Sequence, residues 1–150
     1  TRLVELAAAT GLFTPADAAS LLGGVLDDFH AGRLGEGHDV QVWADASGIA
    51  GWIYLAPSFK AEGVWDLWWI GVDPRRHRQG VGTQVLAAVE ERVAMLGGRL
   101  LIIETSATPP LEPARWFYRQ RGYRECGTIP DFYGEGDDKV IFAKRVQPRT

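Results

Sequence analysis

The chain has 150 residues, of which 46% are hydrophobic and 23% charged, and its formal net charge is −3. This length suits a single domain over residues 1–150, and no apolar run approaches the roughly 18 residues that cross a bilayer, so we expect no membrane partner. The negative charge argues against a nucleic-acid partner, which needs a broadly basic face, and a single cysteine without a secretory signal predicts a cytoplasmic chain with no internal disulfide.

The opening segment predicts two helices, the second capped by Thr14 and ended by the stretch HAGRLGEG at residues 30–37. Two stretches with alternating or continuous apolar residues follow, at residues 39–45 and 48–56. Because a short turn joins them, they predict an antiparallel hairpin. The stretch VWDLWWIGV at residues 64–72 predicts a third strand.

A long helix is predicted from Val81, with Gly97 and Gly98 ending it. Its apolar face consists of Val85, Val89, Val93 and Leu96. The apolar run LLII at residues 100–103 follows at once and is typical of a strand buried on both faces. Strand, helix and strand therefore predict a right-handed crossover between two parallel strands.

The last third of the chain predicts a short helix at residues 114–122 and two strands, at residues 123–129 and 139–146. An acidic, glycine-rich loop at residues 129–139 separates these strands, and it is either a hairpin turn or a lip that binds a cationic ligand. The order of the elements predicts an α/β (α+β) domain with a mixed, mostly antiparallel sheet. We expect the three tryptophans of the third strand to pack in the core: Trp65, Trp68 and Trp69.

One junction, VDPRRHRQGVGTQVL at residues 72–86, is poorly explained by folding alone. Basic side chains at residues 75–78 repel one another, and Gly80 and Gly82 lower helix stability. A strand that feeds a helix through glycine-rich backbone presents unpaired N–H groups beside the positive end of the helix dipole. Such a junction suits phosphate oxygens, and the arginines make a pyrophosphate the expected ligand.

Three phosphate-binding motifs compete for this junction. A nucleotide P-loop requires Lys and then Ser or Thr after its last glycine, but Thr83 and Gln84 follow Gly82. A dinucleotide-binding fingerprint requires a third glycine where Val85 stands. Because Glu104 lies where a ribose-binding acid would, the dinucleotide alternative stays open.

The third motif matches residues 72–91, VDPRRHRQGVGTQVLAAVEE. This stretch resembles the acyl-CoA pyrophosphate loop of the GNAT superfamily of acetyl-CoA-dependent N-acetyltransferases. Gly80 and Gly82 take the glycine positions of the family pattern, whereas His77 stands where the family usually has Arg or Gln.

A second stretch, ARWFYRQRGYREC at residues 114–126, resembles the C-terminal motif of the same family, with Tyr118 and Gly122 at its two fixed points. The two motifs together are more specific than either alone. The resemblance implies a single-domain GNAT-like fold with helices on both faces of a mixed sheet. Its two central parallel strands, residues 66–72 and 100–104, would splay apart at their ends.

The resemblance also implies acetyl-CoA as the cofactor. The pantetheine arm would enter between the splayed strands and pair with the backbone of Ile70, Gly71 and Val72, where an N–H group would polarise the acetyl carbonyl. The residues expected to hold the pyrophosphate are His77, Arg78, Gln79, Gly80, Val81, Gly82 and Thr83.

The implied reaction is transfer of an acetyl or other acyl group to a primary amine of a small molecule, peptide or protein, by direct attack through a tetrahedral intermediate. Tyr118 would protonate the leaving thiolate, because a phenol with a pKa of about 10 is protonated at neutral pH. Glu104 is the first candidate to accept the proton of the amine, and Asp66 and Glu62 are alternatives.

A noncatalytic acyl-CoA-binding or regulatory module is the main competing interpretation, and it would bind acetyl-CoA without releasing a thiol. The family resemblance suggests a homodimer as well. His30 and His38 lack the spacing of metal ligands, so no metal site is expected.

Overall fold

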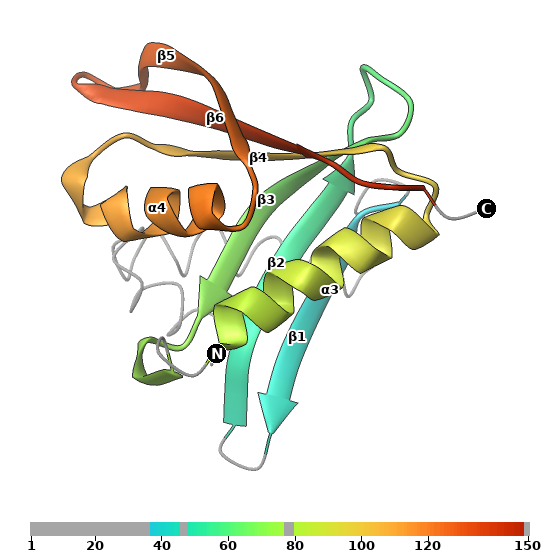
Figure 1. The fold of residues 1–150 in the computed structure, drawn as a ribbon. Helices are drawn as coiled ribbons and strands as arrows, with labels where there is room; N and C mark the ends of the chain where they lie inside the picture. The colour runs from blue at the N-terminus through green and yellow to red at the C-terminus, as the bar shows by residue number, and fades with distance from the viewer. Residues whose placement is uncertain (1–36, 46–47, 77–79, 149–150) are drawn as a thin grey trace. The chain divides into compact units, whose positions relative to one another are not determined.

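The computed structural model describes residues 37–45, 48–76 and 80–148, and the two helices predicted in the opening segment lie outside the described residues. Within these ranges, six strands form one sheet in the order β1-β2-β3-β4-β6-β5 (Figure 1). The strands are β1 (Asp39–Asp45), β2 (Gly48–Pro57), β3 (Val64–Val72), β4 (Leu100–Ser106), β5 (Arg124–Gly134) and β6 (Asp137–Arg145). The described helices are α3 (Val81–Met95), α4 (Glu112–Gln120) and the 3-10 helices η1 (Pro74–Arg76) and η2 (Pro109–Leu111). The predicted mixed, mostly antiparallel sheet is confirmed.

These elements fall into two compact units. The first unit contains β1, β2, residues 69–72 of β3 and residues 81–88 of α3. The second contains the remaining parts of β3 and α3, together with β4, α4, β5 and β6. The end of β3 and the beginning of α3 therefore belong to the same unit, whereas α4 belongs to the other.

The core of the first unit is built around β2, whose residues 50–56 are all buried. β1 pairs with β2 in the antiparallel sense, as predicted. Gly51 faces α3, because a Cβ atom at this position would lie 3.2 Å from Val85 Cγ2 and 3.7 Å from Val81 Cγ1. Since side chains alternate along a strand, Trp52 points to the opposite face of β2.

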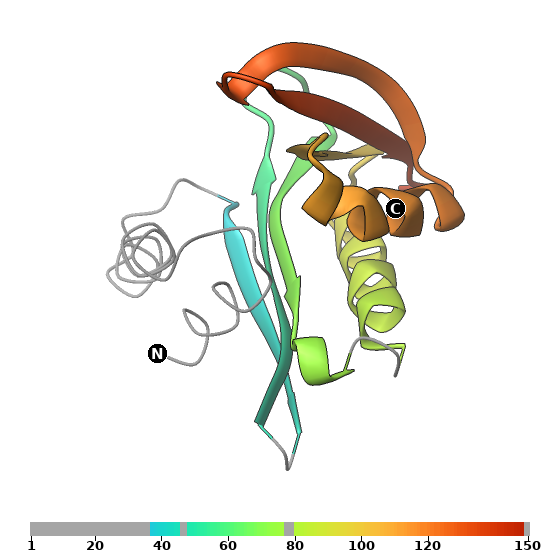
Figure 2. The same ribbon diagram turned by 90° about the vertical axis from the view of Figure 1, so that its left-hand side faces the viewer.

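The second unit contains the predicted parallel pair of strands. Residues 64–67 of β3 pair with residues 100–103 of β4, and the pairing stops there although both strands continue. β4 pairs antiparallel with β6, and β6 pairs antiparallel with β5. α4 lies on one face of β6, where the ring centroids of Tyr118 and Phe142 are 5.6 Å apart (Figures 1 and 2).

Three predictions about burial are wrong. In β4 only Leu101 and Ile103 are buried, and the alternate residues of the run are partly exposed, so this strand is fully covered on one face only. Trp68 is 50% exposed because it lies on the opposite face of β3 from its buried neighbour. Leu96 is 42% exposed because α3 ends one residue earlier, at Met95.

Residues 129–139, predicted as a loop, are mostly strand. Only Glu135 and Gly136 separate β5 from β6. In this stretch, side-chain oxygens take the place of the regular backbone hydrogen bonds between the strands. Asp131 Oδ1 accepts the N–H of Gly136, and Asp138 Oδ1 accepts the N–H of Asp131. These side-chain bonds let β5 continue through an irregular register that a sequence pattern does not reveal.

Candidate functional site

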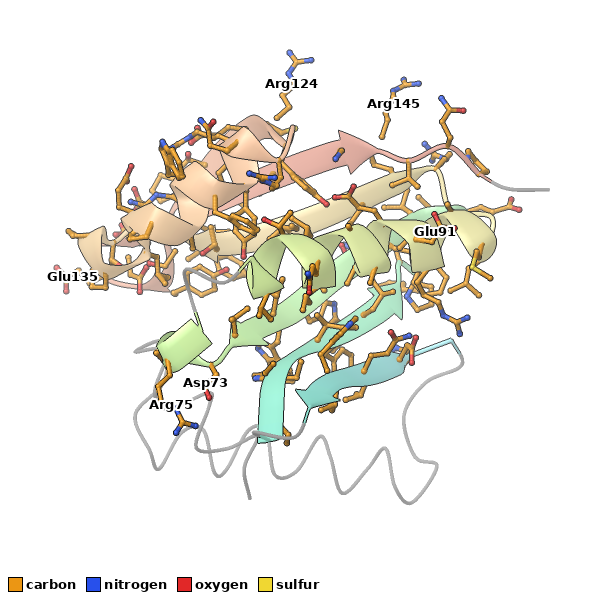
Figure 3. All side chains as sticks on the ribbon, turned by 60° about the horizontal axis from the view of Figure 1, so that its bottom comes forward. Asp73, Arg75, Glu91, Arg124, Glu135 and Arg145 are labelled. Atoms are coloured by element: carbon orange, nitrogen blue, oxygen red, sulfur yellow. The ribbon has the colours of Figure 1, made fainter. Side chains whose placement is uncertain are left out.

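The end of β3 is shaped by Asp73, which is 2% exposed. Its backbone N–H donates to the carbonyl of Ala50 at 2.8 Å, and its Oδ1 accepts the backbone N–H of Arg75 at 3.1 Å. The Arg75 guanidinium also lies 2.8 Å from Asp73 Oδ2, and the two side chains lie together in Figure 3. Asp73 therefore turns the chain into η1 and pairs the charge of one of the basic residues of the junction.

The start of α3 is set by Gly80, whose φ of +75° is readily adopted only by glycine. Its carbonyl accepts the N–H of Gln84 at 3.1 Å. The N–H groups of residues 81–83 lie in the first turn of the helix, where they have no intrahelical acceptor. They form a donor set for an anion at the positive end of the helix dipole. Residues 77–79 and the side chain of Arg76 lie outside what the structure describes.

The last residues of β3 come close to β2 at two glycines. A Cβ atom at Gly51 would lie 3.1 Å from the carbonyl oxygen of Gly71 and also close to Val81 of α3. A Cβ atom at Gly71 would lie 2.4 Å from Nε1 and 2.8 Å from Cε2 of Trp52. The indole ring of Trp52 therefore lies directly over Gly71, in the space that any other side chain would fill.

Aromatic rings continue this face of the first unit. Trp69, which is half-buried, lies with its ring centroid 5.4 Å from that of Tyr54, in an edge-on arrangement, and 6.4 Å from that of Trp52. Tyr54 is also hydrogen-bonded to His38 Nδ1. Favourable edge-on ring packing stabilises the end of β3 against β2.

Tyr118 lies on α4 in an aromatic cluster of the second unit and is 6% exposed. Its ring centroid is 5.9 Å from that of Phe117, 6.2 Å from that of Tyr123 and 5.6 Å from that of Phe142. Burial raises the pKa of Tyr118 well above its usual range. The phenol is therefore fully protonated at neutral pH, as a proton donor must be.

Glu104 is held at the end of β4 by an ion pair. Its Oε2 lies 2.8 Å from Lys139 Nζ, and the Glu104 side chain is 43% exposed whereas that of Lys139 is 10% exposed. The ammonium group of Lys139 also lies 3.8 Å from the ring centroid of Phe132. Among the alternative carboxylates, Asp66 is half-buried, and Glu62 is exposed in the loop before β3.

The register of the sheet places Tyr118 and Glu104 on opposite faces. Glu104 lies opposite Ile141 in the β4–β6 pair, so these two side chains share a face. The next residue, Phe142, points to the other face, and Tyr118 packs against it. Asp66 lies opposite Ile102, two residues before Glu104, so both carboxylates occupy the face away from Tyr118.

Replacing Asp66 by asparagine is expected to raise the free energy of unfolding at about pH 7. Burial and then the charge of Glu104 raise the pKa of Asp66, while Lys139 lowers it. A raised folded-state pKa means that Asp66 stabilises the fold when protonated, and that this stability is lost as the pH rises through the folded-state value. Asparagine keeps the neutral state at every pH.

Urea unfolding of both proteins across the acid range measures this effect. The advantage of Asp66→Asn should shrink toward zero below about pH 4, where the wild-type carboxyl is protonated in both states. Glu104→Gln is the matched control, and it should lower stability near neutral pH because it breaks the ion pair with Lys139. An Asp66→Asn protein less stable than the wild type near neutral pH contradicts the prediction.

The sequence-predicted site residues lie in both units. Ile70, Gly71, Val72, Gly80, Val81, Gly82 and Thr83 belong to the first unit, Glu104 and Tyr118 belong to the second, and His77, Arg78 and Gln79 lie outside the described residues. Sequence reasoning missed Trp52. No motif marks this residue, and only the register of β2 against β3 brings it over Gly71.

The fold and the family comparison together define a class of protein. A strand ending at a glycine turn, a helix whose first turn presents anion donors and a buried tyrosine on the following helix are the features that the resemblance to an acyl-CoA-dependent acetyltransferase led us to expect. Residues 36–125 match the family model described as the Acetyltransferase (GNAT) domain. The chain belongs to the GNAT family of acetyltransferases, so the resemblance seen in residues 72–91 and 114–126 is confirmed.

Solved structures with the same fold include members of this family. A Desulfovibrio desulfuricans protein assigned to the GNAT acetyltransferases is 32% identical, with a TM-score of 0.87, and the match covers 95% of this chain and 89% of that one. An aminoglycoside 6'-N-acetyltransferase complexed with coenzyme A is 19% identical, with a TM-score of 0.73 and coverage of 99% and 91%. The Escherichia coli ribosomal-protein-S18-alanine N-acetyltransferase is 20% identical, with a TM-score of 0.66 and coverage of 83% and 79%.

None of the proteins with curated descriptions matches the sequence significantly. Membership of the family nevertheless defines the activity: the chain is an acyl-CoA-dependent N-acyltransferase that transfers an acetyl group from acetyl-CoA to an amine. In the described part of the chain, no helix has the length and apolar character of a membrane span.

Proposed function

We propose that this enzyme acetylates a primary amine of a small molecule, peptide or protein, and that it holds acetyl-CoA at the end of β3 and the start of α3. The observation that carries this proposal is the conformation of Gly80. Its positive φ starts α3 with the N–H groups of residues 81–83 unpaired within the helix. A Cβ atom at Gly80 would meet no described atom within 4 Å, so the described residues leave this glycine uncovered at the start of α3.

The residues at the end of β3 fit the remainder of the cofactor. Acetyl-CoA supplies an acetyl group activated as a thioester, on a long arm rich in amide groups. The backbone of residues 70–72 would hold this arm by hydrogen bonds, as the family resemblance implies. Gly71 supports this role because it has no side chain of its own to obstruct the backbone, and the ring of Trp52 packs over it.

Two side chains of the second unit would handle protons. Burial raises the pKa of Tyr118, so its Oη keeps a proton at neutral pH. We assign this phenol as the proton donor to the leaving sulfur. Glu104 is assigned as the group that accepts the proton of the amine, directly or through a water molecule. Tyr118 and Glu104 lie on opposite faces of the β4–β6 pair, so the two proton transfers are assigned to two separate groups.

The surroundings of Glu104 favour a positively charged acceptor. Asp66 and Glu104 share one sheet face, and Lys139 neutralises only part of their charge. The solved structures named for aminoglycoside and ribosomal-protein substrates illustrate the two acceptor classes that remain open. We place the enzyme in the cytoplasm, since the exposed thiol of Cys126 suits a reducing compartment.

Calorimetric titration tests the cofactor site. The wild-type protein should bind acetyl-CoA, and S-acetylpantetheine, which lacks the pyrophosphate, should bind at least roughly 100-fold more weakly because the α3 donors have no anion to hold. NAD is the control for the dinucleotide alternative and should not bind. Failure to bind acetyl-CoA, or equal binding of S-acetylpantetheine, contradicts the proposal.

A screen of amines for thiol release then separates an enzyme from a noncatalytic binding module. Polyamines, aminoglycosides and short peptides with a free N-terminus cover the acceptor classes. Release of free coenzyme A only in the presence of an amine is the expected result. Binding of acetyl-CoA without release for any amine would support the noncatalytic module.

A further inference from the structure

Trp52 contains a polar atom for which the described residues offer no hydrogen-bond partner. Its side chain is almost fully buried, at 3% exposed, and Nε1 is the one buried side-chain nitrogen or oxygen left unpartnered in the described part of the chain. A buried donor without a partner costs about 1–3 kcal/mol. A structure that keeps such a donor requires a reason for it, or a partner that arrives later.

The position of this donor follows from the pairing of β2 and β3. Gly51 faces α3, so Trp52 points to the opposite face of β2. Gly71 has no side chain, and the indole ring of Trp52 therefore packs over this residue of the neighbouring strand. The three atoms closest to a Cβ at Gly71 are Nε1, Cε2 and Cδ1, all of the pyrrole ring, at 2.4, 2.8 and 3.1 Å.

Nε1 of Trp52 therefore lies over Gly71, the middle of residues 70–72. This is the stretch whose backbone is proposed to bind the arm of acetyl-CoA. The arm and the acetyl group contain carbonyl oxygens, which are the natural acceptors for an indole N–H. Ring contacts with Trp69 restrict the orientation of the indole, so the donor is held in place before any ligand binds.

We propose that the indole N–H of Trp52 donates a hydrogen bond to a carbonyl oxygen of bound acetyl-CoA. This inference rests on the proposed function, because it requires the cofactor to bind along residues 70–72. Trp52 thus adds a side-chain donor to the backbone donors of β3. If the acceptor is the thioester oxygen, the same bond stabilises the negative charge that develops there during transfer.

Nuclear magnetic resonance of the indole groups tests this directly on the wild-type protein. The chain has six tryptophans, so labelling tryptophan with ¹⁵N yields six indole N–H signals, and the signal missing in Trp52→Phe identifies Trp52. Saturation with acetyl-CoA should move the Trp52 proton signal downfield and slow its exchange with solvent. Saturation with coenzyme A, which lacks the acetyl group, identifies the acceptor oxygen. If the shift is lost, the acceptor is the thioester oxygen, and if the shift is retained, the acceptor is an amide oxygen of the arm.

Calorimetry on the same samples separates this inference from the proposed function. An unmoved Trp52 signal in a sample shown to be saturated with acetyl-CoA overturns the inference and leaves the cofactor site intact. Absence of acetyl-CoA binding overturns both.

Kinetics provide a second readout. Trp52→Phe keeps an aromatic ring but loses the N–H, and kcat/KM for acetyl-CoA should fall roughly tenfold. Trp116→Phe is the matched control, because Trp116 is 59% exposed on α4, and its kcat/KM should equal that of the wild type. Equal kcat/KM for Trp52→Phe and the wild type contradicts the inference.

Discussion

Tyr118→Phe is expected to lower kcat by roughly 100-fold while leaving the KM for acetyl-CoA nearly unchanged. The substitution removes the phenolic proton but keeps the ring, and with it the packing against Phe142. A group that acts only as the sulfur departs contributes to the transition state and not to cofactor binding, so the effect should appear in kcat. Steady-state kinetics with the acceptor from the amine screen measure both constants.

Tyr123→Phe is the matched control for this prediction. Tyr123 belongs to the same aromatic cluster, and its hydroxyl donates to Glu90 Oε2 at 2.9 Å. Loss of that bond should cost about 1 kcal/mol of stability and leave kcat close to the wild-type value. A wild-type kcat for Tyr118→Phe, or an equal loss in both variants, would remove Tyr118 from the mechanism.

The pH dependence of kcat adds a test of the same assignment. Because burial raises the pKa of Tyr118, the phenol keeps its proton up to at least about pH 10. The wild-type and Tyr118→Phe profiles should therefore be parallel through the range in which the fold is stable. An alkaline loss of activity centred below about pH 9 that is present only in the wild type would contradict this expectation.

Gly71→Ala is expected to weaken acetyl-CoA binding by roughly 10-fold to 100-fold and to lower the free energy of unfolding by about 1–3 kcal/mol. The new Cβ atom would lie 2.4 Å from Trp52 Nε1 and 2.8 Å from Cε2, so the indole ring must move. Trp52 is buried, and displacement of its ring shifts both the end of β3 and the N–H group proposed to face the cofactor. Calorimetry and urea unfolding measure the two effects.

Gly98→Ala is the control that separates strain from cofactor binding. A Cβ atom at Gly98 would lie 2.4 Å from Val93 Cγ1 and 2.8 Å from Trp65 Cδ1, a contact as close as that at Gly71 but in the second unit. Both variants should lose stability, and only Gly71→Ala should lose affinity for acetyl-CoA in the range where both are folded. Equal affinities of the two variants would show that the contact between Gly71 and Trp52 serves stability alone.

Most elements of the fold were predictable because their signals are local. The strand predicted at residues 64–72 matches β3 from end to end, since an apolar run bounded by a glycine and by the stretch Asp-Pro has few alternatives. The helix that begins at Val81 and the short helix that carries Tyr118 are also where the sequence places them, within two residues. The loop predicted at residues 129–139 was wrong because side-chain bonds from Asp131 and Asp138 extend the strands.

The sequence by itself determined the family of this protein and the positions of Gly80, Gly82 and Tyr118, because the motif around each is contiguous in the chain. Only the tertiary structure decided which side chains meet. Trp52 covers Gly71, and Lys139 pairs with Glu104, through strand registers that no local pattern specifies. A shift of one residue in either register would turn these side chains to the other face of the sheet, so the contacts around the site follow from how the whole sheet packs.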